Sequence, residues 1–139
     1  MATTTAAVTL TSDLLSDNMS VSTSTTCMKG GTSADGLDQI DMGYVEIATG
    51  TNFDLLNADD TNNVNKANKV YVANESTDET YYVVITIDAT VVGRLYAGDW
   101  MFIPWGAEDA TADIEIQAYT GTNKISYAYL HEGKLLGSA

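Results

Sequence analysis

The sequence predicts an all-β protein: an antiparallel β-sandwich, jelly-roll-like or Ig-like, of about eight or nine short strands with an N-terminal arm. Three observations support this fold class. Apolar and polar residues alternate with a period of two, which places one face of a strand on a core. Gly, Asn and Asp recur between these runs as turn signals. No stretch has a helical period, so no helix is expected.

The stretch from 80 to 105, TYYVVITIDATVVGRLYAGDWMFIPW, is the part around which we expect the rest to be built, because it contains both Trp residues and the only Pro. Residues 81–88 alternate clearly, and 91–96 form a second run. Residues 97–99, Ala-Gly-Asp, indicate a turn. Residues 100–105 are apolar on both sides, as expected of a strand that is buried on two faces or covered by a partner.

The N-terminal arm, residues 1–12, is Thr-rich and β-prone, with Val8 and Leu10 on one face. We expect the arm to pair with an edge of its own sheet or with a neighbouring subunit. Residues 13–139 are predicted to form a single β-sandwich domain, since a chain of 139 residues suits one core.

The remaining elements follow the same patterns. Residues 29–41 and 52–68 are read as long connections, because Gly, Asn and Asp are frequent in them. Residues 120–123, Thr-Gly-Thr-Asn, predict a hairpin turn. The other expected strands cover residues 19–27, 44–48, 69–73, 113–118 and 125–129.

The charge balance excludes several partners. Six Lys and Arg residues face 19 Asp and Glu residues, which gives a formal net charge of −13. Such a surface repels nucleic acid and anionic membranes. No signal peptide and no apolar run of about 20 residues is visible. We therefore expect a soluble protein, synthesised in the cytoplasm, with no nucleic-acid or membrane partner. Cys27, the only cysteine, cannot form an internal disulfide and is expected to be a small buried hydrophobe.

Groups suited to catalysis are few. The pair His131 and Glu132 could serve as acid and base, although a lone His near a chain end is more typically a surface residue. Paired carboxylates of the glycosidase kind could arise wherever two acids lie close in space. No nucleophile has a recognisable partner set, so we expect no enzyme, no catalytic residues and no cofactor.

One loop could offer oxygen ligands to Ca²⁺, through Asp59, Asp60, Asn62 and Asn63. The alternating spacing and the distal Glu of an EF-hand are missing from it. A plain Asx-rich loop is therefore the favoured interpretation, and no bound metal is expected.

A group of aromatic residues with a nearby Arg has three interpretations: filling of the core, a contact surface for a partner, or a platform for sugar rings. Large aromatic residues and Arg are the usual anchors of protein interfaces. Together with the arm, they give the predicted partner-interface residues Val8, Leu10, Arg94, Trp100, Phe102 and Trp105.

Four segments together resemble small virion proteins of tailed bacteriophages, marine ones especially. The segments are TLTSDLL…SVSTSTTCMKGGTSADGLDQID, KVYVANESTDETYYVVITID, GRLYAGDWMFIPW and KISYAYLHEG, and they span most of the chain. The resemblance implies a structural protein without catalytic residues. Such proteins commonly serve as capsid decoration (cement) proteins that bind the shell exterior beside the major capsid protein, often as homotrimers. Tail, neck and head-fibre components are alternatives, and a carbohydrate-binding β-sandwich module is the alternative from another class.

Overall fold

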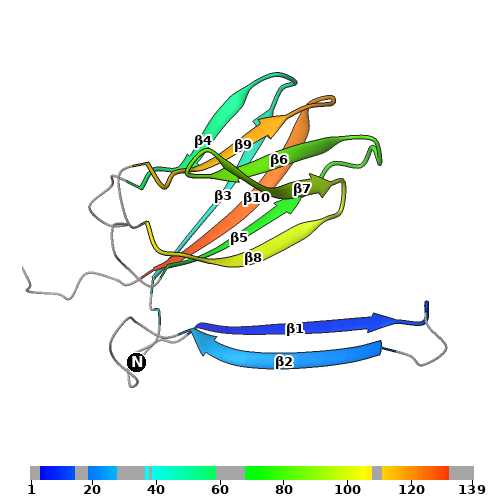
Figure 1. Ribbon diagram of the computed structural model, residues 1–139, viewed down its shortest axis with the longest axis vertical. Coiled ribbons are helices and arrows are strands. Elements are labelled where there is room, and N and C mark those ends of the chain that lie inside the picture. Colours follow the sequence, from blue (N-terminus) through cyan, green and yellow to red (C-terminus); the bar gives the residue numbers. More distant parts are fainter. Residues whose placement is uncertain are drawn as a thin grey trace, which may run out of the picture.

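The computed structural model describes residues 4–14, 19–27, 37, 39–58, 68–107 and 111–131. Within these residues the secondary structure consists of strands, all paired antiparallel, without any helix (Figure 1). The predicted all-β class is therefore confirmed, with one strand more than the upper expected number. The strands are β1 (Thr4–Ser12), β2 (Met19–Cys27), β3 (Gln39–Ile47), β4 (Asn52–Leu56), β5 (Asn68–Asn74), β6 (Tyr82–Ile87), β7 (Thr90–Tyr96), β8 (Trp100–Trp105), β9 (Ile114–Ala118) and β10 (Asn123–His131).

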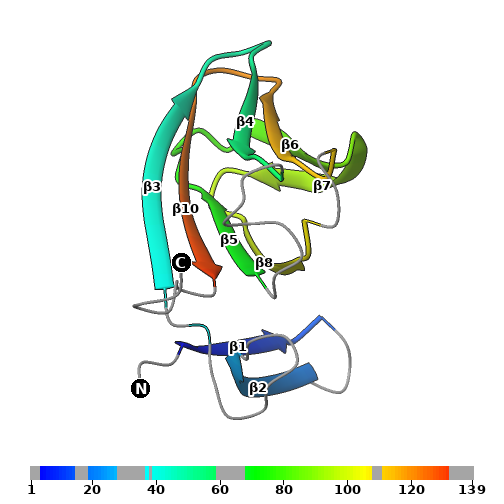
Figure 2. The ribbon, with the colours of Figure 1, turned by 90° about the vertical axis from the view of Figure 1, so that its left-hand side faces the viewer.

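Strands β3 to β10 form a sandwich of two four-stranded sheets (Figure 2). The first sheet has the order β3-β10-β5-β8, and the second has the order β4-β9-β6-β7. Pairs are nested along the chain: β3 pairs with β10, β4 with β9, β5 with β8, and β6 with β7. A long antiparallel ribbon that rolls up into two sheets gives this nesting, which is the jelly-roll architecture. Of the two sandwich types predicted, the jelly roll is the one found.

The core lies between the two sheets, where the inward side chains of both meet. Ile125 of the first sheet and Ile85 and Ile116 of the second have no exposed surface. Trp105 also belongs to this core, and its indole Nε1 donates a hydrogen bond to the Ala112 carbonyl at 2.8 Å. The period-two pattern thus predicted the buried faces correctly, because burial of alternate residues is what creates it.

Three details of the expected chain path are corrected. Strand β4 lies inside the stretch 52–68 that was read as a connection, and its short run is held by pairing with β9. Strand β3 begins at Gln39, before the expected start at residue 44. The turn at 120–123 is not a hairpin, since β9 belongs to the second sheet and β10 to the first. Each error has the same cause: strand pairing is non-local and is not visible in the residues of one segment.

Strands β1 and β2 form a separate two-stranded sheet, called here the hairpin (Figure 1). The N-terminal arm therefore pairs within its own chain, from Thr4 opposite Cys27 to Ser12 opposite Met19. The strand expected at residues 19–27 exists, but it pairs with the arm instead of entering the sandwich. A domain boundary at residue 12 stays a prediction, while the change from one sheet to the next falls after Cys27.

Candidate functional site

The hairpin has an apolar face and a hydroxyl-rich face. Its register places Leu10 opposite Val21, and Thr9 opposite Ser22 on the other face. The Thr9 and Ser22 hydroxyls are 3.4 Å apart. Neither strand contains a charged residue. The apolar hairpin face is the one that carries Ala6, Val8, Leu10, Met19 and Val21, together with Thr4, Ser12, Thr23, Thr25 and Cys27.

The base of the hairpin is packed against the first sheet. A small buried cluster joins the two, formed by Cys27, Leu37 and Leu130 with Ala6 and Phe102 packed against it. The Leu37 amide donates to the Cys27 carbonyl at 2.9 Å, which fixes the chain as it leaves β2. Cys27 is buried, so the prediction of a small buried hydrophobe is confirmed.

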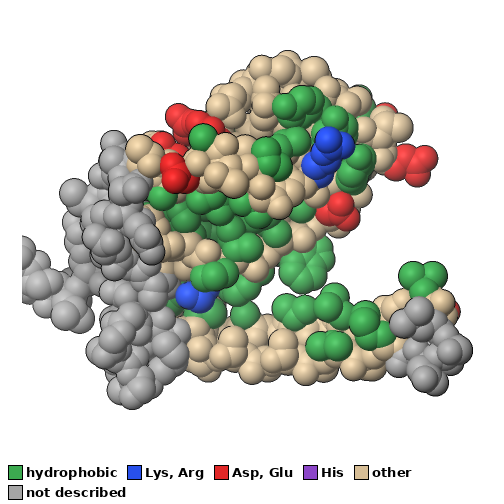
Figure 3. Space-filling view, in the orientation of Figure 1, with side chains coloured by type: hydrophobic (Ala, Val, Ile, Leu, Met, Phe, Trp, Pro, Cys, Tyr) green, Lys and Arg blue, Asp and Glu red, His purple; other side chains and the backbone are tan. Residues whose placement is uncertain are grey.

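Beyond this base, a groove of about 320 Å³ separates the hairpin from the first sheet. Val8 lines one wall, and Tyr71, Trp100 and Phe102 line the other. The rings of Tyr71 and Trp100 are 6.2 Å apart between centroids and tilted by 34°. Figure 3 shows hydrophobic side chains on the side of the hairpin that faces the sandwich, with open space between them and the sandwich. Three of the predicted interface residues, Val8, Trp100 and Phe102, therefore meet at one groove.

Apolar residues continue past the groove towards the hairpin tip. Leu10 is 49% exposed and Val21 opposite it is 48% exposed, although both lie on the apolar hairpin face. The outer face of β3 adds the exposed side chains of Ile40, Met42 and Tyr44. Tyr44 was expected on a strand, but Ile40 fell in the expected connection 29–41 and Met42 lay before the expected strand start, so this apolar face was not predicted. Their spacing of two residues would have revealed one apolar face of a strand.

Two predicted interface residues lie elsewhere. Trp105 is only 3% exposed, so it cannot contact a partner while the sandwich is folded, and the core interpretation is correct for this indole. Trp100 is 49% exposed, so the two indoles have different environments. Arg94 lies on β7 in the second sheet and does not line the groove. Strand β8 is an edge strand of the first sheet and is not buried on two faces.

His131 is paired with a residue other than the one expected. Its Nε2 lies 2.8 Å from Asp41 Oδ2, and its ring stacks on Tyr129 with centroids 4.3 Å apart. The His131 side chain is buried, which corrects the expectation of a surface residue. Glu132, its expected partner, lies outside the described residues. Neither His131 nor Asp41 lines the groove between the hairpin and the first sheet.

One pair of carboxyl groups is brought together on the exposed side of the second sheet. Asp54 of β4 lies opposite Glu115 of β9, and their side chains share a hydrogen bond. Glycosidases hold their two carboxyl groups about 5–5.5 Å or about 6.5–9.5 Å apart, with room for a sugar bond or a water. A directly hydrogen-bonded pair on an open sheet face fits neither arrangement.

The same contact raises the pKa of Asp54 above its ordinary value, chiefly because the hydrogen bond with Glu115 favours the protonated form. Desolvation and repulsion from Glu115 and Asp113 act in the same direction. A raised pKa in the folded state means that ionisation of Asp54 disfavours folding. Stability is thus lost as the pH rises through the folded-state pKa, and it is regained below the ordinary pKa of aspartate.

An Asp54→Asn variant should therefore be more stable than the parent at pH 7. Because the pair is exposed, the expected rise in melting temperature is small, about 1 to 2 °C. The difference should vanish below about pH 4, where Asp54 is protonated in both states. Thermal unfolding followed by circular dichroism at pH 7 and pH 3.5 measures both values. An equal difference at the two pH values would contradict the assignment to ionisation.

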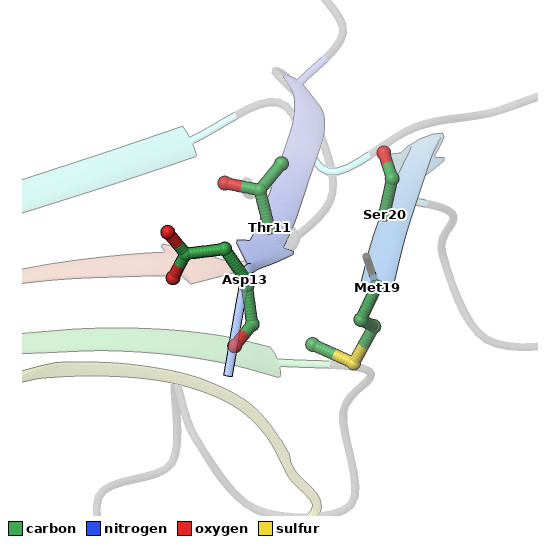
Figure 4. A pocket seen from close by; sticks show the side chains of 5 residues that line it. Thr11, Asp13, Met19 and Ser20 are labelled. Atoms are coloured by element: carbon green, nitrogen blue, oxygen red, sulfur yellow. The ribbon is translucent and has the colours of Figure 1, made fainter. Parts of the chain in front are cut away.

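A second concavity, of about 440 Å³, lies at the tip of the hairpin (Figure 4). Thr11 and Asp13 line it from the β1 side, and Met19 and Ser20 line it from β2. The carboxylate of Asp13 points away from the Ser20 hydroxyl (Figure 4). Its lining contains a single carboxylate and no histidine, so these residues do not assemble a reactive centre.

The described part of the chain contains no group of three or more His, Cys, Asp or Glu side chains that could hold a metal ion. The possible calcium ligands Asp59, Asp60, Asn62 and Asn63 lie outside the described residues. Among the residues placed by the structure, no helix is long and apolar enough to span a membrane.

The comparisons with known proteins include a faint structural likeness. Neither a protein-family model nor a curated protein matches the chain. A solved structure of a cupin protein from Bacteroides fragilis is similar over 72% of this chain and 75% of that chain, with 16% identity and a TM-score of 0.36. A likeness of this size carries no conclusion about function, so the amphipathic hairpin and the groove behind it are the features on which a function has to rest.

Proposed function

We propose that this protein is a non-enzymatic structural component of a tailed-phage virion: a capsid decoration (cement) protein that binds the outside of the shell and stabilises contacts between capsomers. The observation that carries the proposal is the hairpin, which has uncharged strands and an apolar face that the sandwich leaves partly uncovered. The resemblance of four sequence segments to small phage virion proteins supports the same role.

The hairpin can bind a neighbour through its main chain. Within the described residues, β1 pairs with β2 alone, so each strand has an outer edge available for a further strand. A free edge presents N–H and C=O groups that readily pair with the sheet edge of another chain. Such pairing fixes position without requiring particular side chains. A decoration protein that repeats over many similar sites benefits from this kind of contact.

Charge is separated from the contact element. The chain has 19 acidic residues against six basic ones, but strands β1 and β2 contain none of either. The acidic sandwich keeps free copies soluble and away from nucleic acid. The hairpin, in contrast, can be covered without burying a charge, which would cost several kcal/mol per unpaired ion. This separation suits a protein that is made in the host cytoplasm and binds the capsid exterior after assembly.

The partners implied are the major capsid protein and further copies of the same chain. We infer a homotrimer, because a decoration protein placed on a three-fold axis of the shell meets two copies of itself. The exposed outer face of β3, with Ile40, Met42 and Tyr44, offers an apolar surface next to the hairpin for such contacts. Light scattering of the free protein and of protein released from shells measures the oligomeric state.

The test is binding to purified shells that lack the decoration layer. A Leu10→Ser/Val21→Ser variant changes one cross-strand pair on the apolar hairpin face. Thr9→Ala/Ser22→Ala changes the adjacent pair on the opposite face and is the matched control. We expect the first variant to bind roughly a hundredfold more weakly, since each apolar side chain contributes about 1.5–3 kcal/mol when fully buried. The control should stay within about threefold of the parent, as expected for contacts outside an interface core.

Point substitutions test the role of the hairpin more specifically than removal of the arm, because deleting residues 1–12 also leaves β2 without a partner strand. Equal binding of both double variants would remove the hairpin from the docking surface. Electron microscopy of the particle then shows the position and copy number of the protein. Many copies over the shell support decoration, whereas a few copies at one vertex favour the tail, neck or head-fibre alternative.

The carbohydrate-binding alternative is not favoured at the residues first considered for it. Trp105 is buried in the core, and the half-exposed Trp100 is beside Tyr71 in the groove. The two indoles therefore do not share an exposed platform on which a sugar ring could stack.

A further inference from the structure

Three tyrosines form a row across the outer face of the second sheet, on the side away from the core. Tyr96 of β7 lies opposite Tyr82 of β6, and the Tyr119 amide donates to the Tyr82 carbonyl at 3.2 Å. Ring centroids are 5.1 Å apart for Tyr82 and Tyr96, and 5.7 Å apart for Tyr82 and Tyr119. The outer two rings are exposed, with 42% for Tyr96 and 49% for Tyr119. We call these residues the tyrosine row.

A register row with three polar side chains runs beside the tyrosine row. Arg94, Gln117 and Asn52 are on β7, β9 and β4, and the apolar Val84 of β6 lies between Arg94 and Gln117. The guanidinium Cζ of Arg94 is 5.2 Å from the centroid of the Tyr82 ring, so a cation–π contact holds it in place. No ion pair of Arg94 occurs with any residue in the described ranges. Arg94 thus presents a positioned guanidinium beside the aromatic rings, and Gln117 and Asn52 add polar side chains in the same register row.

The combination fits a sugar better than a protein partner. Sugar rings have a C–H face that packs on aromatic rings and hydroxyl groups that need fixed donors and acceptors. The exposed carboxyl pair Asp54 and Glu115 occupies the next position along the same face and can accept hydrogen bonds from hydroxyls. A protein that covered this face would have to desolvate the two acids, which is costly. A sugar chain leaves them partly hydrated.

The charge of the protein selects among sugars. A net charge of −13 and two carboxyl groups on this face repel a polyanionic chain. We propose that the tyrosine row, with Arg94 and Gln117, is a binding site for a neutral polysaccharide. This site lies on the second sheet, whereas the hairpin and its groove adjoin the first. The proposed sugar site can therefore be tested independently of the decoration role.

The experiment is native gel electrophoresis of the full-length protein in gels that contain one polysaccharide each: neutral dextran, soluble starch, galactomannan or hydroxyethylcellulose, and anionic alginate or pectate. We expect retardation by at least one neutral polymer. Tyr119→Ala should weaken it roughly tenfold in dissociation constant, as expected for loss of one stacking ring. Thr9→Ala/Ser22→Ala is the control, because both side chains are on the separate β1–β2 sheet and outside the proposed contact surfaces.

Several results would overturn the site. Absence of retardation in every gel excludes it, and so does retardation that Tyr119→Ala and Thr9→Ala/Ser22→Ala reduce equally. Retardation by alginate or pectate alone that is lost in Arg94→Gln would assign the face to anions instead.

One further result would support the site. Normal sugar binding by the Leu10→Ser/Val21→Ser variant would show that the site does not depend on the hairpin.

Discussion

An Ile85→Asp variant is expected not to fold, and Ile116→Asp is expected to behave in the same way. The two side chains are register partners on β6 and β9, and neither has any exposed surface. A carboxylate at either position would be buried in the core without a partner. That costs more than about 4 kcal/mol, against a total stability of about 5–15 kcal/mol for a domain.

Circular dichroism and solubility after expression measure this effect. Val91→Asp is the matched control, since Val91 lies on the neighbouring strand β7 and is 63% exposed. The free energy of unfolding of the control should be within about 1 kcal/mol of the parent value, as is general for surface substitutions. A cooperative unfolding transition of Ile85→Asp close to that of the parent would show that this position is not in the core.

The second large effect is expected at Asn74, the last residue of β5. This buried side chain ties the two sheets together: its Nδ2 donates to the Leu95 carbonyl and to Asn123 Oδ1, both at 3.0 Å. Its Oδ1 accepts from the Ser76 amide at 3.1 Å. Leucine has a similar size but none of these groups. Asn74→Leu therefore leaves buried polar atoms without partners, at roughly 3 kcal/mol in total.

Calorimetry should find the melting temperature of Asn74→Leu about 10 °C below that of the parent. Asn52→Leu, at the exposed first residue of β4, is the control and should change it by less than about 2 °C. A small effect at Asn74 would mean that packing alone holds this end of the sandwich.

Local patterns were sufficient to predict most strands and the buried faces. Residues 81–88 and 113–118 alternate because one side of each strand meets the other sheet, and that signal is contained in the segment itself. Strand β4 could not be found in this way. It is five residues long, and its identity depends on β9, which is distant in the sequence.

The candidate sites were predicted less completely, for a similar reason. Val8, Trp100 and Phe102 were proposed as interface residues from their types, and the structure brings them to one groove. The sequence does not predict the row of Tyr82, Tyr96 and Tyr119, because two members are on β6 and β7 and the third directly follows β9, so they become neighbours through register alone. Residue type can suggest that a contact surface exists, whereas the set of residues that form it depends on the order of strands in the sheet.

The nested strand pairs also determine when the polypeptide can fold during translation. Gln39 pairs with His131, so the first sheet cannot close until residue 131 has left the ribosome. Such a high contact order is typical of slowly folding proteins. The two strands of the hairpin are close in the sequence, so their pairing closes a short loop alone and can occur much earlier. During translation, a nascent chain therefore has a folded hairpin and an unfolded sandwich for some time. In that interval the exposed hairpin edges could pair prematurely with another chain.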